Sequence, residues 1–78
     1  MGQADLPLAS GEKHARALER AGLVILPRRG RGKHFLLQRP GARPIISIPD
    51  HREVKRSLLA KQLKLARISE SEYATYFR

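Results

Sequence analysis

Three short apolar runs, each stopped by proline or by a proline–glycine turn, constrain the fold of this chain more than any other feature. The runs are residues 23–26, 33–38 and 43–48, and the residues that stop them are Pro27, Pro40-Gly41 and Pro49. β-Branched and aromatic residues favour strands, whereas proline cannot donate a hydrogen bond within a sheet ladder. The sequence therefore predicts three short antiparallel strands.

Segments rich in helix-forming residues flank these strands. Ser10 is a good amino-terminal cap for the first helix, and Gly22 suits a left-handed stop. The last segment opens with the spacing of a capping box, in which a serine and a glutamate cap the same helix start. The predicted helices are residues 11–21, a segment that begins between Asp50 and Ser57 and ends near Ala66, and a short helix opened by Ser69-Glu70-Ser71-Glu72.

The order of these elements predicts an α+β fold with helices on one face of a three-stranded antiparallel sheet. One strand face, with Phe35 and Leu37, is apolar, which requires a helical layer over it and leaves the other face open. We expect one domain over residues 1–78, of which 1–9 form a flexible segment and 10–78 the folded part. Three aromatic residues near the carboxyl end are expected to close the core, namely Tyr73, Tyr76 and Phe77.

The charge balance points to a polyanionic partner. Sixteen Lys and Arg against seven Asp and Glu give a net charge of +9, which concentrates nucleic acid near the surface. A basic surface that serves only solubility is the alternative. The chain has no cysteine and no apolar run near the ~20 residues of a membrane span. We therefore expect a cytoplasmic protein that binds RNA and no membrane.

Histidine is the side chain that most readily exchanges protons near neutral pH, so the three histidines are the acid–base candidates. His14 falls among Arg and Ala residues of the first helix, and we expect an ordinary exposed side chain there. His51 follows Pro49-Asp50 at the start of the second helix. A structural role for His51 is favoured over an assisting role in catalysis.

His34 has a different setting, because it follows Gly32-Lys33 at the start of a strand. A glycine-containing basic turn brings amide groups and cations close to one imidazole, which suits a phosphate. His34 could take a proton from a ribose 2′-OH, while Lys33 with Arg31 or Arg29 neutralises the charge that develops on phosphorus. No metal or cofactor is required. A half-exposed structural histidine on the open sheet face is the alternative.

Several sharper motifs are absent from the sequence. A phosphate-binding P-loop would need glycine at Pro27 and Ser or Thr at His34. The histidines lack the spacing and the companion ligands of a zinc site, and no G-x-S-x-G nucleophile motif occurs. ATP hydrolysis, metal-dependent chemistry and acyl transfer are therefore not indicated.

An ordered set of short segments between Ser10 and Phe77 resembles the HicA (YcfA-like) toxins of toxin–antitoxin modules. The segments are Ala21-Gly22-Leu23, Gly32-Lys33-His34-Phe35, Ile46-Ser47-Ile48-Pro49, His51, Leu59, Leu63, Ala66, Ile68-Ser69 and Tyr76-Phe77. The resemblance implies a double-stranded-RNA-binding-domain-like fold, metal-independent cleavage of mRNA and neutralisation by a HicB-type antitoxin that covers the active site. It places the family's catalytic histidine on His34.

This chain departs from the pattern of the family at three positions. Lys33 stands where serine or another small residue is usual, and Ser57 and Arg67 stand where glycines are common. Lys33 could strengthen phosphate binding or crowd His34. Glycine normally marks a left-handed or crowded backbone position, so the other two changes concern loop geometry rather than chemistry.

Two hypotheses from different classes follow, with a structural protein of a ribonucleoprotein particle as a weaker third. The first is a metal-independent endoribonuclease toxin with catalytic His34 and no cofactor. The residues expected to bind the RNA phosphates are Lys33, Arg31, Arg29, Arg28 and Gly32. His51 is the residue that could assist His34 in catalysis. The second is a non-catalytic RNA-binding domain of the same fold, which would contact phosphates and read shape.

Overall fold

A computed structural model describes residues 6–27 and 33–77 and shows the predicted α+β architecture. The helices and strands, in chain order, are α1 (Gly11–Arg20), β1 (Val24–Ile25), β2 (His34–Gln38), β3 (Ile45–Pro49), α2 (Arg56–Ala66) and α3 (Glu70–Tyr76). The element order, the capped helix starts and the approximate strand positions confirm the sequence prediction. Helix α2 begins inside the predicted window and ends at the predicted residue.

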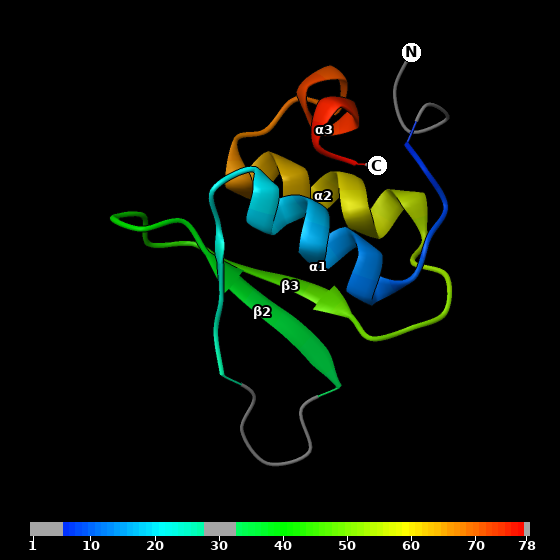
Figure 1. The fold of residues 1–78 in the computed structure, drawn as a ribbon, viewed down its shortest axis with the longest axis horizontal. Helices are drawn as coiled ribbons and strands as arrows, with labels where there is room; N and C mark the ends of the chain where they lie inside the picture. The colour runs from blue at the N-terminus through cyan, green and yellow to red at the C-terminus, as the bar shows by residue number, and fades with distance from the viewer. Residues whose placement is uncertain (1–5, 28–32, 78) are drawn as a thin grey trace.

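The three strands form one antiparallel sheet in the order β1-β2-β3. Helices α1 and α2 lie side by side on one face of it, and α3 lies beyond them (Figure 1). Leu37 of β2 is fully buried beneath the helices. On the opposite face Val24, Gln38 and Ile45 lie across the three strands in register, and Val24 and Ile45 are about half exposed. The open face was predicted.

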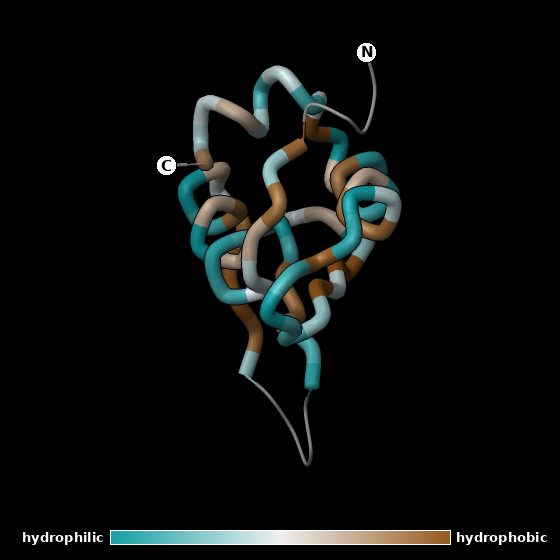
Figure 2. The backbone as a smooth tube through the Cα atoms, turned by 90° about the vertical axis from the view of Figure 1, so that its right-hand side faces the viewer, coloured by the Kyte–Doolittle hydropathy of each residue, from teal (hydrophilic) through white to brown (hydrophobic). Residues whose placement is uncertain are grey.

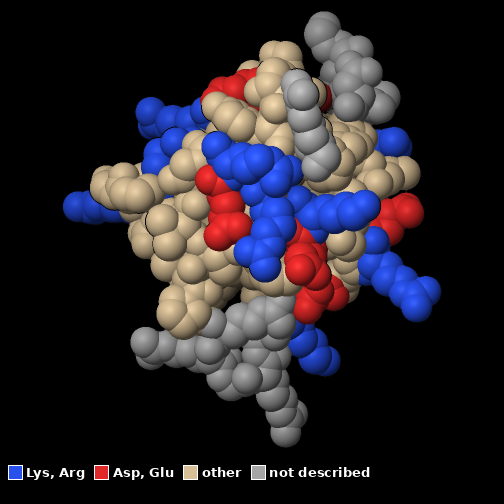
Figure 3. All heavy atoms as spheres, in the orientation of Figure 1, with Lys and Arg blue, Asp and Glu red and all other residues tan. Residues whose placement is uncertain are grey.

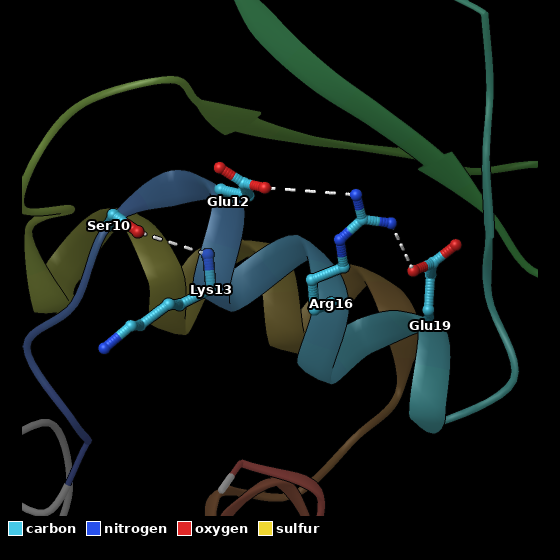
Figure 4. Close-up of polar contacts among 5 residues, drawn as sticks. All are labelled: Ser10, Glu12, Lys13, Arg16 and Glu19. Atoms are coloured by element: carbon cyan, nitrogen blue, oxygen red, sulfur yellow. Dashed lines mark hydrogen bonds and ion pairs between the residues drawn. The ribbon is translucent and has the colours of Figure 1, made fainter.

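Helix α1 begins and ends where its capping residues dictate. The Ser10 side chain accepts a hydrogen bond of 3.2 Å from the Lys13 amide. On the exposed side of the helix, Arg16 lies between Glu12 and Glu19, at 3.9 and 3.0 Å (Figure 4). Exposed pairs of this kind contribute only a few tenths of a kcal/mol each. Their main effect is to neutralise the two acidic side chains locally.

One hydrophobic cluster fills the space between the sheet and the helices. Along the backbone around this cluster, apolar residues alternate with polar ones (Figure 2). Leu6 belongs to this cluster, at 2% exposure. The Leu6 carbonyl accepts a 2.7 Å hydrogen bond from Arg56, and the Ala9 carbonyl accepts one of 2.9 Å from Val54. Leu6 and Ala9 therefore contact α2 and the segment before it. The flexible segment expected over residues 1–9 stays a prediction.

The prediction that His14 is an ordinary exposed residue is wrong. His14 is completely buried, and its Nδ1 shares a 2.6 Å hydrogen bond with the hydroxyl of Tyr73. The His14 ring also lies 5.2 Å from the Phe77 ring, centroid to centroid. Helix α1 packs against the sheet on one side and against α3 on another. His14 lies on the side that faces α3 and is buried there. Of the three aromatics expected in the core, Tyr73 is fully buried, and Tyr76 and Phe77 are half-buried.

Burial of His14 predicts a loss of stability at mildly acidic pH. Burial lowers the pKa of His14 from 6.5 to about 4, so between these values the unfolded chain binds a proton that the folded chain excludes. The contribution of His14 to the free energy of unfolding is therefore fully present above pH 6.5 and is lost as the pH falls toward 4. The loss amounts to about 3 kcal/mol, at about 1.36 kcal/mol per pKa unit. Urea unfolding at pH 7 and pH 4.5 measures this decline.

Two variants isolate the contribution of His14 from that of the carboxylates. In His14→Gln the side chain keeps a hydrogen-bonding group but does not titrate, so the decline should shrink. In His51→Ala, which removes an exposed histidine, the decline should match that of the native chain. An equal decline in native chain and His14→Gln would contradict the assignment.

Candidate active site

At one end of the sheet, the start of β2 and the end of β3 lie close to the start of α1 (Figure 1). The predicted catalytic histidine belongs to this end. His34 opens β2 and is in register with Pro49, the last residue of β3. One residue further out, the Asp50 amide donates a 2.8 Å hydrogen bond to the Lys33 carbonyl. We call the group Lys33, His34, Pro49, Asp50 and His51 the histidine end of the sheet.

The start of α1 fixes the backbone of this end. The Gly11 amide donates a 2.9 Å hydrogen bond to the His51 carbonyl. A Cβ atom on Gly11 would lie 2.0 Å from the Pro49 carbonyl oxygen, which is a backbone atom that cannot move aside. Only glycine fits at this contact. The sequence predicts only an ordinary helix start at Gly11, because nothing in the local sequence distinguishes it from a replaceable first residue.

The side chains of Lys33, His34 and His51 are all exposed. Within the residues that the structure describes, neither the His34 imidazole nor the His51 imidazole has a hydrogen-bond partner. Both histidines are thus accessible to a large substrate such as a polymer. The hydrogen bond between residues 33 and 50 ties the two backbones together, so both histidines and Lys33 belong to one end of the sheet. These three predicted site residues therefore stand on backbone segments that meet at one end of the sheet.

The remaining predicted site residues are Arg28, Arg29, Arg31 and Gly32, and all four lie outside the described residues. Their role in holding phosphates stays a prediction. Lys33, which follows them in sequence, is the described member of this basic segment.

Positive charge on the described surface is widely distributed. Figure 3 shows Lys and Arg side chains around the outline of the molecule, with acidic side chains interleaved near the centre of this face. The described residues contain no group of three His, Cys, Asp or Glu side chains that could hold a metal ion. No helix in the described part of the chain is long and apolar enough to cross a membrane.

Comparison with protein families adds a finding to this geometry. Residues 11–68 match the family described as "HicA toxin of bacterial toxin-antitoxin". Searches of curated proteins and of solved structures found no match. The matched range runs from the start of α1 to the residue before the cap of α3 and includes the histidine end. Because the match spans most of the 78 residues, the chain belongs to the HicA toxin family and has the role of a toxin with a cognate antitoxin.

Proposed function

We propose that this toxin is a metal-independent endoribonuclease that cleaves mRNA and uses His34 as its acid–base residue. The observation that carries the proposal is the exposed imidazole of His34, next to Lys33, at the start of β2 where that strand pairs with the end of β3. A net charge of +9 brings RNA to such a surface. Because mRNA is the substrate, we place the site of action in the cytoplasm.

The reaction that suits this arrangement uses the ribose hydroxyl as the nucleophile. His34 takes the proton of a 2′-OH, and the 2′ oxygen forms a bond to the adjacent phosphorus. The bond from phosphorus to the 5′ oxygen of the next nucleotide breaks, and that oxygen takes up a proton. The products are a 2′,3′-cyclic phosphate and a 5′-hydroxyl end, so the reaction needs no cofactor and no metal ion.

The cations and the second histidine have supporting roles in this proposal. His51 assists from the other strand end, where it can donate the proton to the leaving oxygen. Lys33 offsets the negative charge that builds up on phosphorus, which is electrostatic transition-state stabilisation. The phosphate-holding residues complete the set, and they are Lys33, Arg31, Arg29, Arg28 and Gly32.

Cleavage of RNA and DNA of one sequence tests the proposal. In EDTA we expect the native chain to cut a defined single-stranded RNA and to leave the matching DNA intact, because DNA lacks the 2′-OH. Binding to both should weaken with salt, with a slope in log K near −0.7 per phosphate contacted on single strands. Binding without cleavage of either polymer would instead identify a non-catalytic RNA-binding domain.

Lys33 provides a second test of the site, because the resemblance to the family implies a small residue at this position. Lys33→Ser should lower kcat and change KM little, because Lys33 acts on the charge that develops on phosphorus in the transition state. Steady-state cleavage of a short RNA measures both constants. A higher kcat in Lys33→Ser would show instead that the lysine crowds His34, and a raised KM with unchanged kcat would limit Lys33 to binding ground-state phosphate.

A further inference from the structure

A second feature lies at the end of the sheet opposite His34, between the turn that joins β2 to β3 and the end of α2 (Figure 1). It is a pocket of about 310 Å³, and its lining is mostly apolar. Leu23 and Ile46 are buried lining residues from the core. Leu65 lines the same pocket and is 50% exposed. The pocket therefore borders the core at this end, next to a half-exposed leucine.

Three arginines and no acidic residue line this pocket, namely Arg39, Arg43 and Arg67. Arg39 donates a 3.3 Å hydrogen bond to the Ala66 carbonyl, which holds its guanidinium against the end of α2. The two acidic residues of α1, Glu12 and Glu19, do not line the pocket and pair with Arg16. The pocket thus combines an apolar interior with an uncompensated positive rim.

The backbone conformation of Arg67 is a second observation that points to a binding role for these arginines. It caps α2 in the left-handed conformation, with φ of 59° and ψ of 41°. Among the residues that the structure describes, no other non-glycine residue has a positive φ. A side chain in this conformation costs roughly 1 kcal/mol that glycine would not incur. Backbone strain at an exposed charged residue is a reason to ask what that residue binds.

The pocket does not overlap the histidine end. Strand β2 runs from His34 to Gln38, four steps of ~3.3 Å that separate the two ends by about 13 Å. Arg39, which follows the strand, reaches the pocket. A ligand in this pocket can therefore bind while the imidazole of His34 remains open, and substitutions here leave the histidine end intact.

The lining favours a protein segment over RNA as the occupant. Single-stranded RNA binds on aromatic platforms where its bases stack, and this pocket contains no aromatic side chain. Protein interfaces instead place an apolar anchor in a desolvated pocket and surround it with polar contacts. Arginines around such an anchor pair best with carboxylates.

We propose that this pocket, which we call the arginine pocket, binds an acidic segment of the cognate antitoxin that inserts one apolar side chain. The side chain would contact Leu23, Ile46 and Leu65, and flanking carboxylates would pair with Arg43 and Arg67. This contact is additional to the covering of the active site that the family resemblance implies, because the pocket is separate from the histidine end. This inference uses the partner that family membership implies and does not require that His34 cleave RNA.

The test measures the affinity of the full-length cognate antitoxin for variants of the toxin made in a His34→Ala background, which keeps expression tolerable. Arg43→Ala combined with Arg67→Gly removes two charges, and the glycine suits the left-handed position, so the fold should be retained. Leu65→Asp places a carboxylate at the rim without burying it. We expect each variant to weaken antitoxin binding at least tenfold by titration calorimetry.

A matched control removes two charges elsewhere, in Lys13→Ala combined with Lys55→Ala, both exposed. This control should bind the antitoxin within about twofold of the parent. RNA affinity should be equal in the control and in Arg43→Ala/Arg67→Gly. Antitoxin affinity unchanged in both pocket variants would overturn the proposal, as would a larger loss of RNA affinity than of antitoxin affinity. Neither outcome would bear on the nuclease activity of His34.

Discussion

Replacement of His34 by alanine is expected to lower the rate of RNA cleavage by ~10²–10⁴-fold, the range that general acid–base catalysis supplies. The imidazole is exposed and has no structural partner among the described residues. Its removal should therefore leave the fold and the RNA affinity unchanged. Single-turnover cleavage in EDTA, with an RNA-binding titration of the same preparations, measures both quantities.

His51→Ala is the informative comparison for that experiment. If His51 assists by protonating the leaving oxygen, its loss should slow cleavage by a smaller factor than the loss of His34. Both variants keep the hydrogen bond that ties residues 33 and 50, since that bond is between backbone atoms. Cleavage by His34→Ala at the native rate would exclude His34 from the chemistry.

Gly11→Ala is expected to cause the largest loss of stability from a single added methyl group. The new Cβ would lie 2.0 Å from the Pro49 carbonyl oxygen and 3.1 Å from the Asp50 Cα. Because these atoms belong to the backbone, either α1 or the segment after β3 must shift. Overpacking costs of ~1–3 kcal/mol are typical, and we expect the upper end of that range. Thermal unfolding should show a Tm lower by about 10 °C or more.

The shift should also reach the histidine end, because Gly11 holds the His51 carbonyl. We therefore expect slower cleavage by Gly11→Ala even below its unfolding temperature. Gly41→Ala is the matched control, since a Cβ there meets nothing within 4 Å and only its φ of 84° is unfavourable. That control should lose about 1 kcal/mol and keep its activity. Equal losses of stability in both variants would show that the close contact at Gly11 is not restrictive.

Local signals in the sequence were sufficient for most of the fold. Caps at Ser10 and Ser69 and the left-handed Gly22 place helix ends correctly, because each acts within one turn of its own helix. The alternation of Phe35 and Leu37 with His34 assigns the strand faces, because side chains alternate between the two faces of a strand. His34 could be singled out together with Lys33, since the two are adjacent in sequence and both are exposed at the start of β2.

Contacts between distant segments could not be predicted in this way. His14 is buried because α3 packs on α1, through the hydrogen bond to Tyr73, 59 residues further along the chain. Leu6 joins the core through residues of α2 and the segment before it. The crowding of Gly11 depends on Pro49 and the arginine pocket on three separate segments. None of these contacts leaves a periodic pattern in the sequence.

The most direct test of the central claim is induced expression of the native chain and of His34→Ala in cells that lack the antitoxin, with the length of cellular mRNA followed over time. The proposed function predicts growth arrest and rapid shortening of mRNA with the native chain, and neither effect with His34→Ala at equal protein level. Growth arrest by both chains with intact mRNA would contradict it, because the toxin would then act without cleaving RNA.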